Sequence, residues 1–178
     1  MKISAIHLKD FKSYKGYHKL ENLDEGLSEN KNIILLGGLN GAGKTSLLEA
    51  IILGFYGQGA NKLYPSKGAK LERYESFICS LLNKTTARKN SSSIIEEQEK
   101  IIVEIFLKEV NFTRNVSTNI SILREWTIGI SNNKLRLIDE DWKILNSEGK
   151  HFRELNMQRA TTSEYKDRRD QYSDLING

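Results

Sequence analysis

The chain has 178 residues, a net charge of +4 and one cysteine, Cys79. That length suits a single domain with a sizeable core, and a lone cysteine excludes an internal disulfide or a cysteine-rich zinc site. Hydrophobic residues make up 38% of the chain and charged residues 28%. This is polar for a compact domain and indicates either long polar loops or an incomplete surface. The positive charge permits contact with nucleic acid without requiring it.

The sequence shows neither a secretion signal nor a membrane span. Residues 1–4, Met-Lys-Ile-Ser, are not an apolar signal region, and no apolar run approaches the ~18 residues that cross a bilayer. We therefore expect a cytoplasmic protein that makes no contact with a membrane. Cys79 stands in an apolar helical stretch, so a buried thiol is expected there.

The first third of the chain predicts strands followed by a helix. Residues 1–11 alternate between apolar and polar side chains, which predicts a strand, and residues 17–23 suggest a second strand that returns beside it. After a polar loop, residues 33–36 (Ile-Ile-Leu-Leu) predict a buried strand. Residues 44–56 then predict a helix that ends at Gly57.

A phosphate-binding pattern lies between that strand and that helix. Gly38, Gly43, Lys44 and Thr45 match G-x-x-x-x-G-K-[ST] in the order of strand, loop and helix that the pattern requires. Glycines let the backbone turn with positive φ, so that successive N–H groups point into one concavity at the positive end of a helix. In this pattern Lys44 serves the β- and γ-phosphates and the Thr45 hydroxyl serves Mg²⁺. The sequence therefore predicts a site for a nucleoside triphosphate.

Beyond Gly57 the period of the apolar residues changes. The expected elements are, in order, a loop at 57–69, a helix at 70–84, a basic loop at 84–93, an antiparallel β region at 95–145 and a helical tail at 147–176. The β region shows hairpin turn signals at 132–133 and at 139–141. The basic loop is either solvated or in contact with a phosphate backbone.

An ATPase with such a loop also needs an acidic pair after an apolar strand, which holds Mg²⁺ and polarises the attacking water. Asp139–Glu140 imitates this pair, but Arg136 interrupts the apolar run before it. Both interpretations, acidic pair and plain hairpin turn, stay open. Gln158 and Gln171 are weak candidates for ligands of magnesium or water. The three histidines show no metal-ligand spacing.

The residues around the loop resemble the head domains of SMC-like ATPases. Three stretches carry this resemblance, namely the loop Gly38–Ser46, the Leu-Leu-Glu-Ala-Ile that follows at 47–51, and the opening Ile6–Tyr14, where Asp10 replaces a common asparagine. Within this SMC/ABC-type superfamily the chain resembles the DndD family, the ATPases of bacterial DNA phosphorothioate (sulfur) modification. Six stretches carry that finer resemblance, at 34–38, 50–57, 74–83, 112–114, 124–126 and 172–176.

The resemblance implies an α/β fold with α+β character. Residues 1–178 would form one N-terminal lobe of a P-loop NTPase head, with an antiparallel β-meander beside the phosphate-loop strand and helix of residues 1–57. A coiled coil and a C-terminal lobe would follow the tail. Two complete heads would close as a homodimer around two ATP molecules and move arms around DNA, with other sulfur-modification proteins as possible partners. This lobe alone would bind ATP and Mg²⁺ with negligible hydrolysis.

The resemblance also implies the roles of individual residues. Lys44 is the catalytic residue, Thr45 is the metal ligand, and the residues from Asn40 to Gly43 donate backbone N–H groups. Lys12 and Ser13 approach the phosphates and the sugar, with Lys12 in place of a common arginine. The whole nucleotide-binding set is Lys12, Ser13, Gly38, Asn40, Gly41, Ala42, Gly43, Lys44, Thr45 and Ser46.

Two other classes of protein stay open. A self-contained P-loop phosphotransferase or GTPase would need a parallel sheet with a helix after each strand, and residues 95–145 lack that helical period. A nucleotide-binding regulator that never hydrolyses ATP differs from an ATPase only in turnover. For DNA, this chain offers the basic residues of 84–90 and a basic tail, whose contacts would weaken as salt rises. The tail contributes Arg159, Lys166, Arg168 and Arg169.

Overall fold

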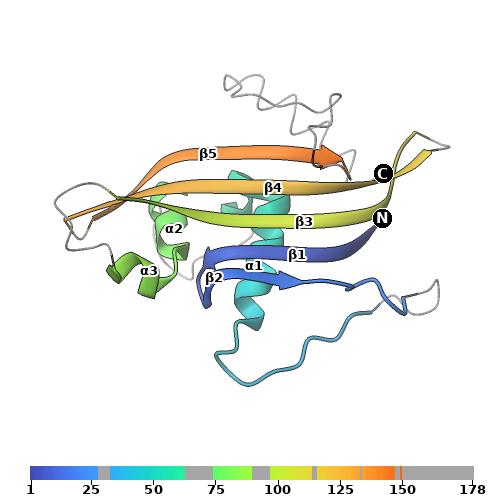
Figure 1. Ribbon diagram of the computed structural model, residues 1–178, viewed down its shortest axis with the longest axis horizontal. Coiled ribbons are helices and arrows are strands. Elements are labelled where there is room, and N and C mark those ends of the chain that lie inside the picture. The colour runs from blue at the N-terminus through green and yellow to red at the C-terminus, as the bar shows by residue number, and fades with distance from the viewer. Residues whose placement is uncertain are drawn as a thin grey trace.

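A computed structural model of the chain describes residues 1–27, 33–62, 74–89, 97–113, 116–132, 134–146 and 149. One antiparallel sheet of five strands organises these residues, in the order β2-β1-β3-β4-β5 (Figure 1). The strands are β1 (Lys2–Phe11), β2 (Tyr14–Leu20), β3 (Glu97–Thr113), β4 (Val116–Ser131) and β5 (Lys134–Asn146). The helices are α1 (Lys44–Tyr56), η1 (Gly57–Lys62), α2 (Tyr74–Leu81) and α3 (Lys84–Lys89).

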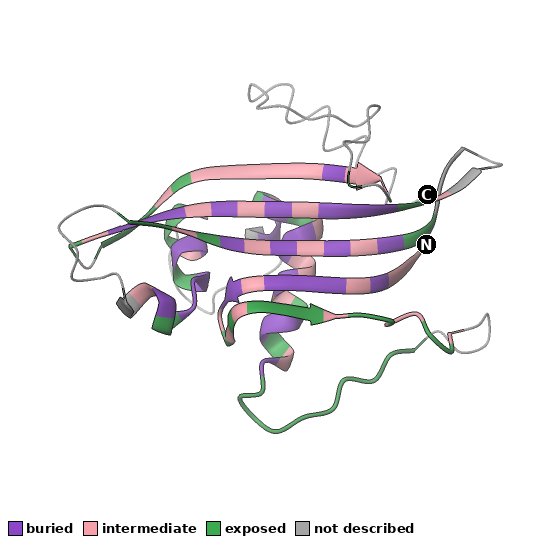
Figure 2. Ribbon diagram, in the orientation of Figure 1, coloured by how far each residue is buried: buried purple, intermediate pink, exposed green. Residues whose placement is uncertain are grey.

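The two faces of the sheet differ in burial. Along β3, Ile101, Val103 and Ile105 are fully buried, whereas the residues between them are half-buried (Figure 2). Because side chains alternate between faces along a strand, the buried set lies on one face. Helix α1 crosses that face, and its Gly54 lies so close that a Cβ there would be 2.5 Å from Ile105 Cδ1. The core therefore lies between α1 and the central strands.

The antiparallel β region predicted after the second helix is confirmed, since β3, β4 and β5 pair in sequence. The turn predicted at 139–141 is wrong, because β5 continues through these residues and pairs with β4. Asp141 forms an ion pair with Lys143, and Glu140 forms one with Arg124 at 3.1 Å. These cations compensate the acidic run, so it is tolerated in a strand.

The strand predicted at 33–36 is not formed. Ile33 is 84% exposed and Leu35 is 92% exposed, and the segment runs as an extended, solvent-facing chain into the phosphate loop (Figure 2). A strand needs a neighbour that satisfies its backbone N–H and C=O groups. No described strand pairs with this segment. Its apolar side chains therefore stay uncovered by the residues that the structure describes.

The helix predicted after the phosphate loop begins at Lys44 and ends at Tyr56 as expected, with Gly57 as its C-cap. Of the helix predicted at 70–84, the structure shows α2, which is shorter than predicted and ends at Leu81. Residues 70–73 lie outside the described residues. A second helix, α3, occupies the start of the predicted basic loop, which corrects that prediction. The tail predicted at 147–176 lies outside the described residues apart from Gly149. Among the described helices, none has both the length and the apolar character needed to cross a bilayer.

The junction between α2 and α3 holds the turn between β1 and β2. The Lys12 N–H donates to Leu81 O at 2.7 Å, and the Asn83 N–H donates to Asp10 O at 2.8 Å. The Asn83 side chain also donates to Lys12 O at 2.6 Å. Asp10 and Lys12 both have positive φ, near 48° and 47°. These bonds stabilise a backbone conformation that non-glycine residues rarely adopt, and they fix the turn beside the start of α1.

Candidate functional site

The start of α1 is open to a ligand. Its N-cap residue is Gly43, with φ 91° and no side-chain cap hydrogen bond. Gly41, two residues earlier, has φ 82°. Glycine adopts these angles without strain, and the first N–H groups of a helix have no partner within the helix. The sequence thus places backbone donors and the positive end of a helix dipole at one point, which suits an anion.

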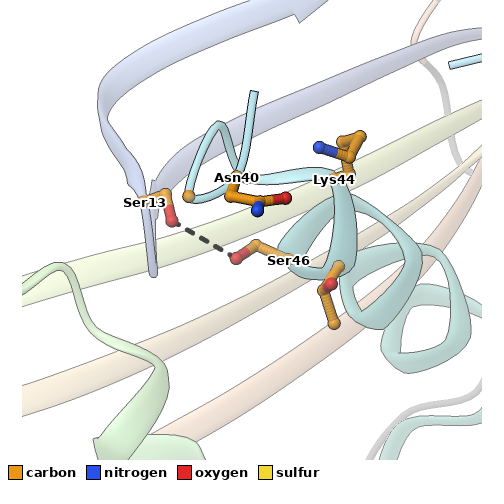
Figure 3. A pocket seen from close by; sticks show the side chains of 7 residues that line it. Ser13, Asn40, Lys44 and Ser46 are labelled. Carbon is orange, nitrogen blue, oxygen red and sulfur yellow. Dashed lines mark hydrogen bonds between the residues drawn. The ribbon is translucent and has the colours of Figure 1, made fainter. Parts of the chain in front are cut away.

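A cavity of about 210 Å³ lies at this helix start. Six of its lining residues come from the loop and the first turn of α1, while Ser13 comes from the β1–β2 turn (Figure 3). The hydroxyls of Ser13 and Ser46 point toward each other, with their oxygens 3.4 Å apart. The lining residues are Ser13, Asn40, Gly41, Gly43, Lys44, Thr45 and Ser46. The cavity is below the size of a typical small-molecule site, so it suits a group such as phosphate rather than a whole nucleotide.

The ammonium of Lys44 is bonded to its own loop. Lys44 Nζ donates to Gly38 O at 2.6 Å and to Leu39 O at 2.8 Å. A lysine ammonium is a mobile point charge with three donors. It can therefore exchange one of these carbonyls for a phosphate oxygen without any change in the backbone.

Tyr14 braces the loop from the side of the sheet. Its hydroxyl donates to Gly43 O at 3.2 Å, and a Cβ at Gly43 would lie 3.2 Å from the ring. Burial raises the pKa of Tyr14 above 10.0, so its hydroxyl remains a donor across the neutral range. Glycine at position 43 thus serves both the positive φ and the close approach of this ring.

The structure brings most of the predicted site residues together. Gly38 takes part as an acceptor for Lys44, and the Ala42 N–H is engaged within the loop because it donates to Leu39 O at 3.2 Å. Lys12 is different, since it lies outside the lining of the cavity and its ammonium forms an ion pair with Glu49 of α1.

Two residues of this region, Tyr14 and Glu49, are not in the predicted set. Both stand in the stretches that resemble SMC-like heads, Ile6–Tyr14 and Leu-Leu-Glu-Ala-Ile at 47–51. The resemblance therefore includes both residues but assigns a role to neither of them.

A second cavity and the candidate acidic pair lie elsewhere. A cavity of about 490 Å³ at the β4–β5 hairpin is lined by Ser131, Asn132, Lys134, Leu135 and Arg136. It is larger than the cavity at the start of α1, but the residues described in its lining include no helix start and no glycine-rich loop that would direct backbone donors into it. Glu140 bonds to Arg124, whose Nε donates to Gly54 O at 2.9 Å. Gly54 is ten residues along α1 from Lys44, or about 15 Å. Glu140 is therefore not placed as the acidic partner of the phosphate loop.

The phosphate loop lies in a mixed α/β domain that is built on a five-stranded antiparallel sheet. A family model described as an AAA domain matches residues 5–177. The chain therefore belongs to that family, an SMC- and ABC-like ATPase family that fits the expected superfamily. Membership supports nucleotide binding, ATP binding and ATPase function. No curated protein matches the chain.

The family implies that Mg²⁺ is used with the nucleotide, and the lining of the cavity fits such an ion in part. Mg²⁺ prefers hard oxygen ligands and usually keeps several waters and substrate phosphates. The exposed hydroxyl of Thr45 offers one such oxygen, while the described lining includes no carboxylate. Elsewhere in the described part of the chain, no group of three or more His, Cys, Asp or Glu side chains is placed to hold a metal. The site thus suits an ion that arrives with a nucleotide.

Proposed function

We propose that this chain is the ATP-binding lobe of an SMC-like ATPase, and that its cavity takes the phosphates of ATP together with Mg²⁺. The observation that carries the proposal is the convergence of two distant segments, because Ser13 and residues of the phosphate loop and first helical turn line one cavity at the open start of α1. Backbone donors, a lysine and hydroxyls around a phosphate-sized space meet the needs of triphosphate recognition. Membership in the AAA domain family supports ATP as the nucleotide.

Each residue of the loop has a distinct task in this proposal. Lys44 exchanges one of its two carbonyl partners, Gly38 O or Leu39 O, for a phosphate oxygen and so binds the β- and γ-phosphates. Thr45 holds Mg²⁺ when the ion is bound, and the ion neutralises charge on the phosphates. The glycines at 41 and 43 let backbone N–H groups approach the phosphate oxygens without an intervening Cβ.

We further propose that a second lobe completes the domain by covering two apolar surfaces. The first is the segment of residues 33–36, of which Leu35 is 92% exposed. The second is a stripe along α1, where Leu48 is 55% exposed and Tyr56 is 48% exposed. These two residues are eight positions apart, so they share one helix face. A strand beside 33–36 would satisfy the backbone N–H and C=O groups of this segment and bury its side chains, which favours a sheet from the C-terminal lobe as the occupant of the first surface.

The need for a second lobe also leads us to expect that this lobe alone does not hydrolyse ATP. Hydrolysis needs a group that positions or activates the attacking water, and the described residues that line the cavity include no carboxylate. We propose that the missing groups come from the second lobe and from a second head, so that ATP closes a homodimer. By resemblance to the DndD family, we extend the proposal to a role in DNA sulfur modification or related DNA processing, together with other sulfur-modification proteins. We place this role in the cytoplasm. DNA contact is assigned mainly to the full-length protein.

A self-contained phosphotransferase or GTPase is the alternative that the fold disfavours. Such proteins place the phosphate loop after a strand of a parallel sheet covered by helices on both faces. The described sheet is antiparallel throughout, and the segment before the loop is in no strand. A regulator that never hydrolyses ATP differs from our proposal only in the assembled protein.

Titration of the chain with Mg²⁺–ATP tests the proposal. Binding should be measurable by calorimetry and lost in Lys44→Ala, because this variant removes the phosphate-binding charge without touching the core. Lys134→Ala is the matched control, since it removes an exposed lysine from the hairpin cavity. Equal binding in Lys44→Ala and the wild type, or loss of binding in Lys134→Ala alone, would place the nucleotide elsewhere. Measurable turnover by the isolated chain would contradict the incomplete-site interpretation.

A further inference from the structure

The ammonium group of Lys12 lies outside the cavity, although the next residue, Ser13, lines that cavity. The side chain of Ser13 faces the cavity, whereas Lys12 Nζ forms an ion pair with Glu49 Oε2. The Glu49 side chain is only 16% exposed and that of Lys12 is 30% exposed. A largely buried carboxylate therefore keeps a cation from a space that suits an anion.

The ion pair lies within one turn of α1 from the cavity. Glu49 follows Thr45 by four positions and Ser46 by three, so all three residues lie on one side of the helix. One helical turn rises about 5.4 Å. Since Ser13 already faces Ser46, the adjacent Lys12 side chain, with its four-carbon stem, spans the distance from Glu49 to the cavity.

Only the side chain of Lys12 is free to change partner. Its backbone N–H donates to Leu81 O and its carbonyl accepts from the Asn83 side chain, at 2.7 Å and 2.6 Å. Its positive φ of 47° is thus fixed on both sides. An exchange of the ammonium between Glu49 and the cavity needs rotation of side-chain bonds and no movement of the turn.

We propose that Glu49 sets the affinity of the site for nucleotide by competing with its phosphates for Lys12. The inference rests on the proposed function of the cavity. A phosphate gains a second lysine only if Lys12 leaves Glu49, and the carboxylate then stays partly buried without its cation. The site therefore binds ATP more weakly than its two lysines allow, and weakening the Lys12–Glu49 pair strengthens binding.

Four variants separate this competition from a simple effect of charge. Glu49→Gln removes the carboxylate charge, while Glu49→Asp keeps the charge and shortens the side chain, which weakens the ion pair. Lys12→Gln removes the contested cation, and each Glu49 variant is also made in the Lys12→Gln background. Mg²⁺–ATP affinity is measured by calorimetry at one ionic strength, and urea unfolding verifies that each variant is folded.

We expect Glu49→Gln to tighten ATP binding about fivefold and Glu49→Asp about twofold, as for a partly exposed ion pair. In the Lys12→Gln background, Glu49→Asp should have no effect and Glu49→Gln should retain only the smaller effect of lost charge. Equal effects in both backgrounds, or weaker binding in Glu49→Gln, would overturn the inference, since Glu49 would then act by charge alone or hold Lys12 in its productive place. Failure of the proposed function is separately visible, because the wild type would then bind no ATP or bind it independently of Lys44.

Discussion

Glu140 accepts a hydrogen bond from Arg124 Nη1 at 3.1 Å, deep beside the C-terminal end of α1. Arg124 is only 5% exposed, and its Nε donates to Gly54 O. Tyr74 donates its hydroxyl to the other carboxylate oxygen of Glu140 at 2.9 Å. Burial and the charge of Glu140 raise the pKa of Tyr74, so this hydroxyl stays a donor. The network joins α1 to α2, β4 and β5 and fixes the far end of the phosphate-loop helix.

Gly57→Ala should destabilise the chain by about 2 kcal/mol. Gly57 has φ 49°, and a Cβ there would lie 2.5 Å from Arg124 Nη1. The guanidinium cannot withdraw without losing its bonds to Gly54 and Glu140. Gly59→Ala is the matched control, because its nearest contact is Tyr56 Cβ at 3.9 Å, and it should stay within about 0.5 kcal/mol of the wild type. Urea unfolding compares the two, and equal stabilities would mean that Arg124 is not fixed in place.

Tyr14→Phe should weaken Mg²⁺–ATP binding about threefold and lower stability by about 1 kcal/mol. The variant keeps the ring against Gly43 but removes the hydroxyl that donates to its carbonyl, so the loop is less fixed before the ligand arrives. Tyr17→Phe removes a hydroxyl bonded to His7 instead and should leave affinity unchanged. Calorimetric titration of both variants checks this. An unchanged affinity in Tyr14→Phe would limit Tyr14 to a structural role.

Leu35→Glu should leave the free energy of unfolding within about 0.5 kcal/mol of the wild type, because this side chain is 92% exposed. It should also lower the fluorescence of a dye that binds apolar surfaces, since the charge interrupts the uncovered segment. Leu53→Glu places the same charge at a fully buried position of α1 and should prevent folding. Strong destabilisation by Leu35→Glu would show that residues 33–36 are already buried in the isolated chain.

Cys79 should resist alkylation in the folded chain. Burial, with a smaller effect of Glu75, raises the pKa of its thiol to about 11. At pH 8 about one molecule in a thousand then carries the reactive thiolate, against about one in ten at the ordinary value of 9.0. Because folding raises this pKa, the protonated thiol favours the folded chain. This contribution to the free energy of unfolding is fully present below pH 9 and is lost as the pH rises toward 11. Iodoacetamide labelling at pH 8 should be slow in buffer and fast in urea, and equal rates would contradict burial.

Local patterns predicted the parts of the fold that are stabilised locally or by adjacent strands. The alternation in residues 1–11 and 95–145, and the glycines that border α1, led to the correct strands and helix. The predictions that failed depend on distant partners. Residues 33–36 have the composition of a buried strand, but no described strand lies beside them. Residues 139–141 read as a turn because one of the cations that stabilise them in β5, Arg124, lies 16 residues earlier on the neighbouring strand β4.

The candidate site was predictable to the extent that it lies in one motif. The loop from Gly38 to Ser46 specifies its own geometry through glycines and a helix start. Ser13 was identified only by resemblance, and the strand pairing that brings it to the loop explains why spacing could not reveal it. The ion pair of Lys12 with Glu49 depends on a turn held by Asn83, a contact across 71 residues of sequence. No local pattern carries that information.

Hydrogen exchange with and without Mg²⁺–ATP tests the central claim most directly, because it locates the nucleotide as well as detecting it. We predict that ATP slows exchange of the backbone N–H groups at residues 40–47 and in the turn around Ser13, and that Lys44→Ala abolishes this protection. The exchange of backbone N–H groups in the β4–β5 hairpin at residues 131–136 should not change when ATP is added. Protection confined to that hairpin, or ATP binding that leaves the phosphate loop unprotected, would contradict the account.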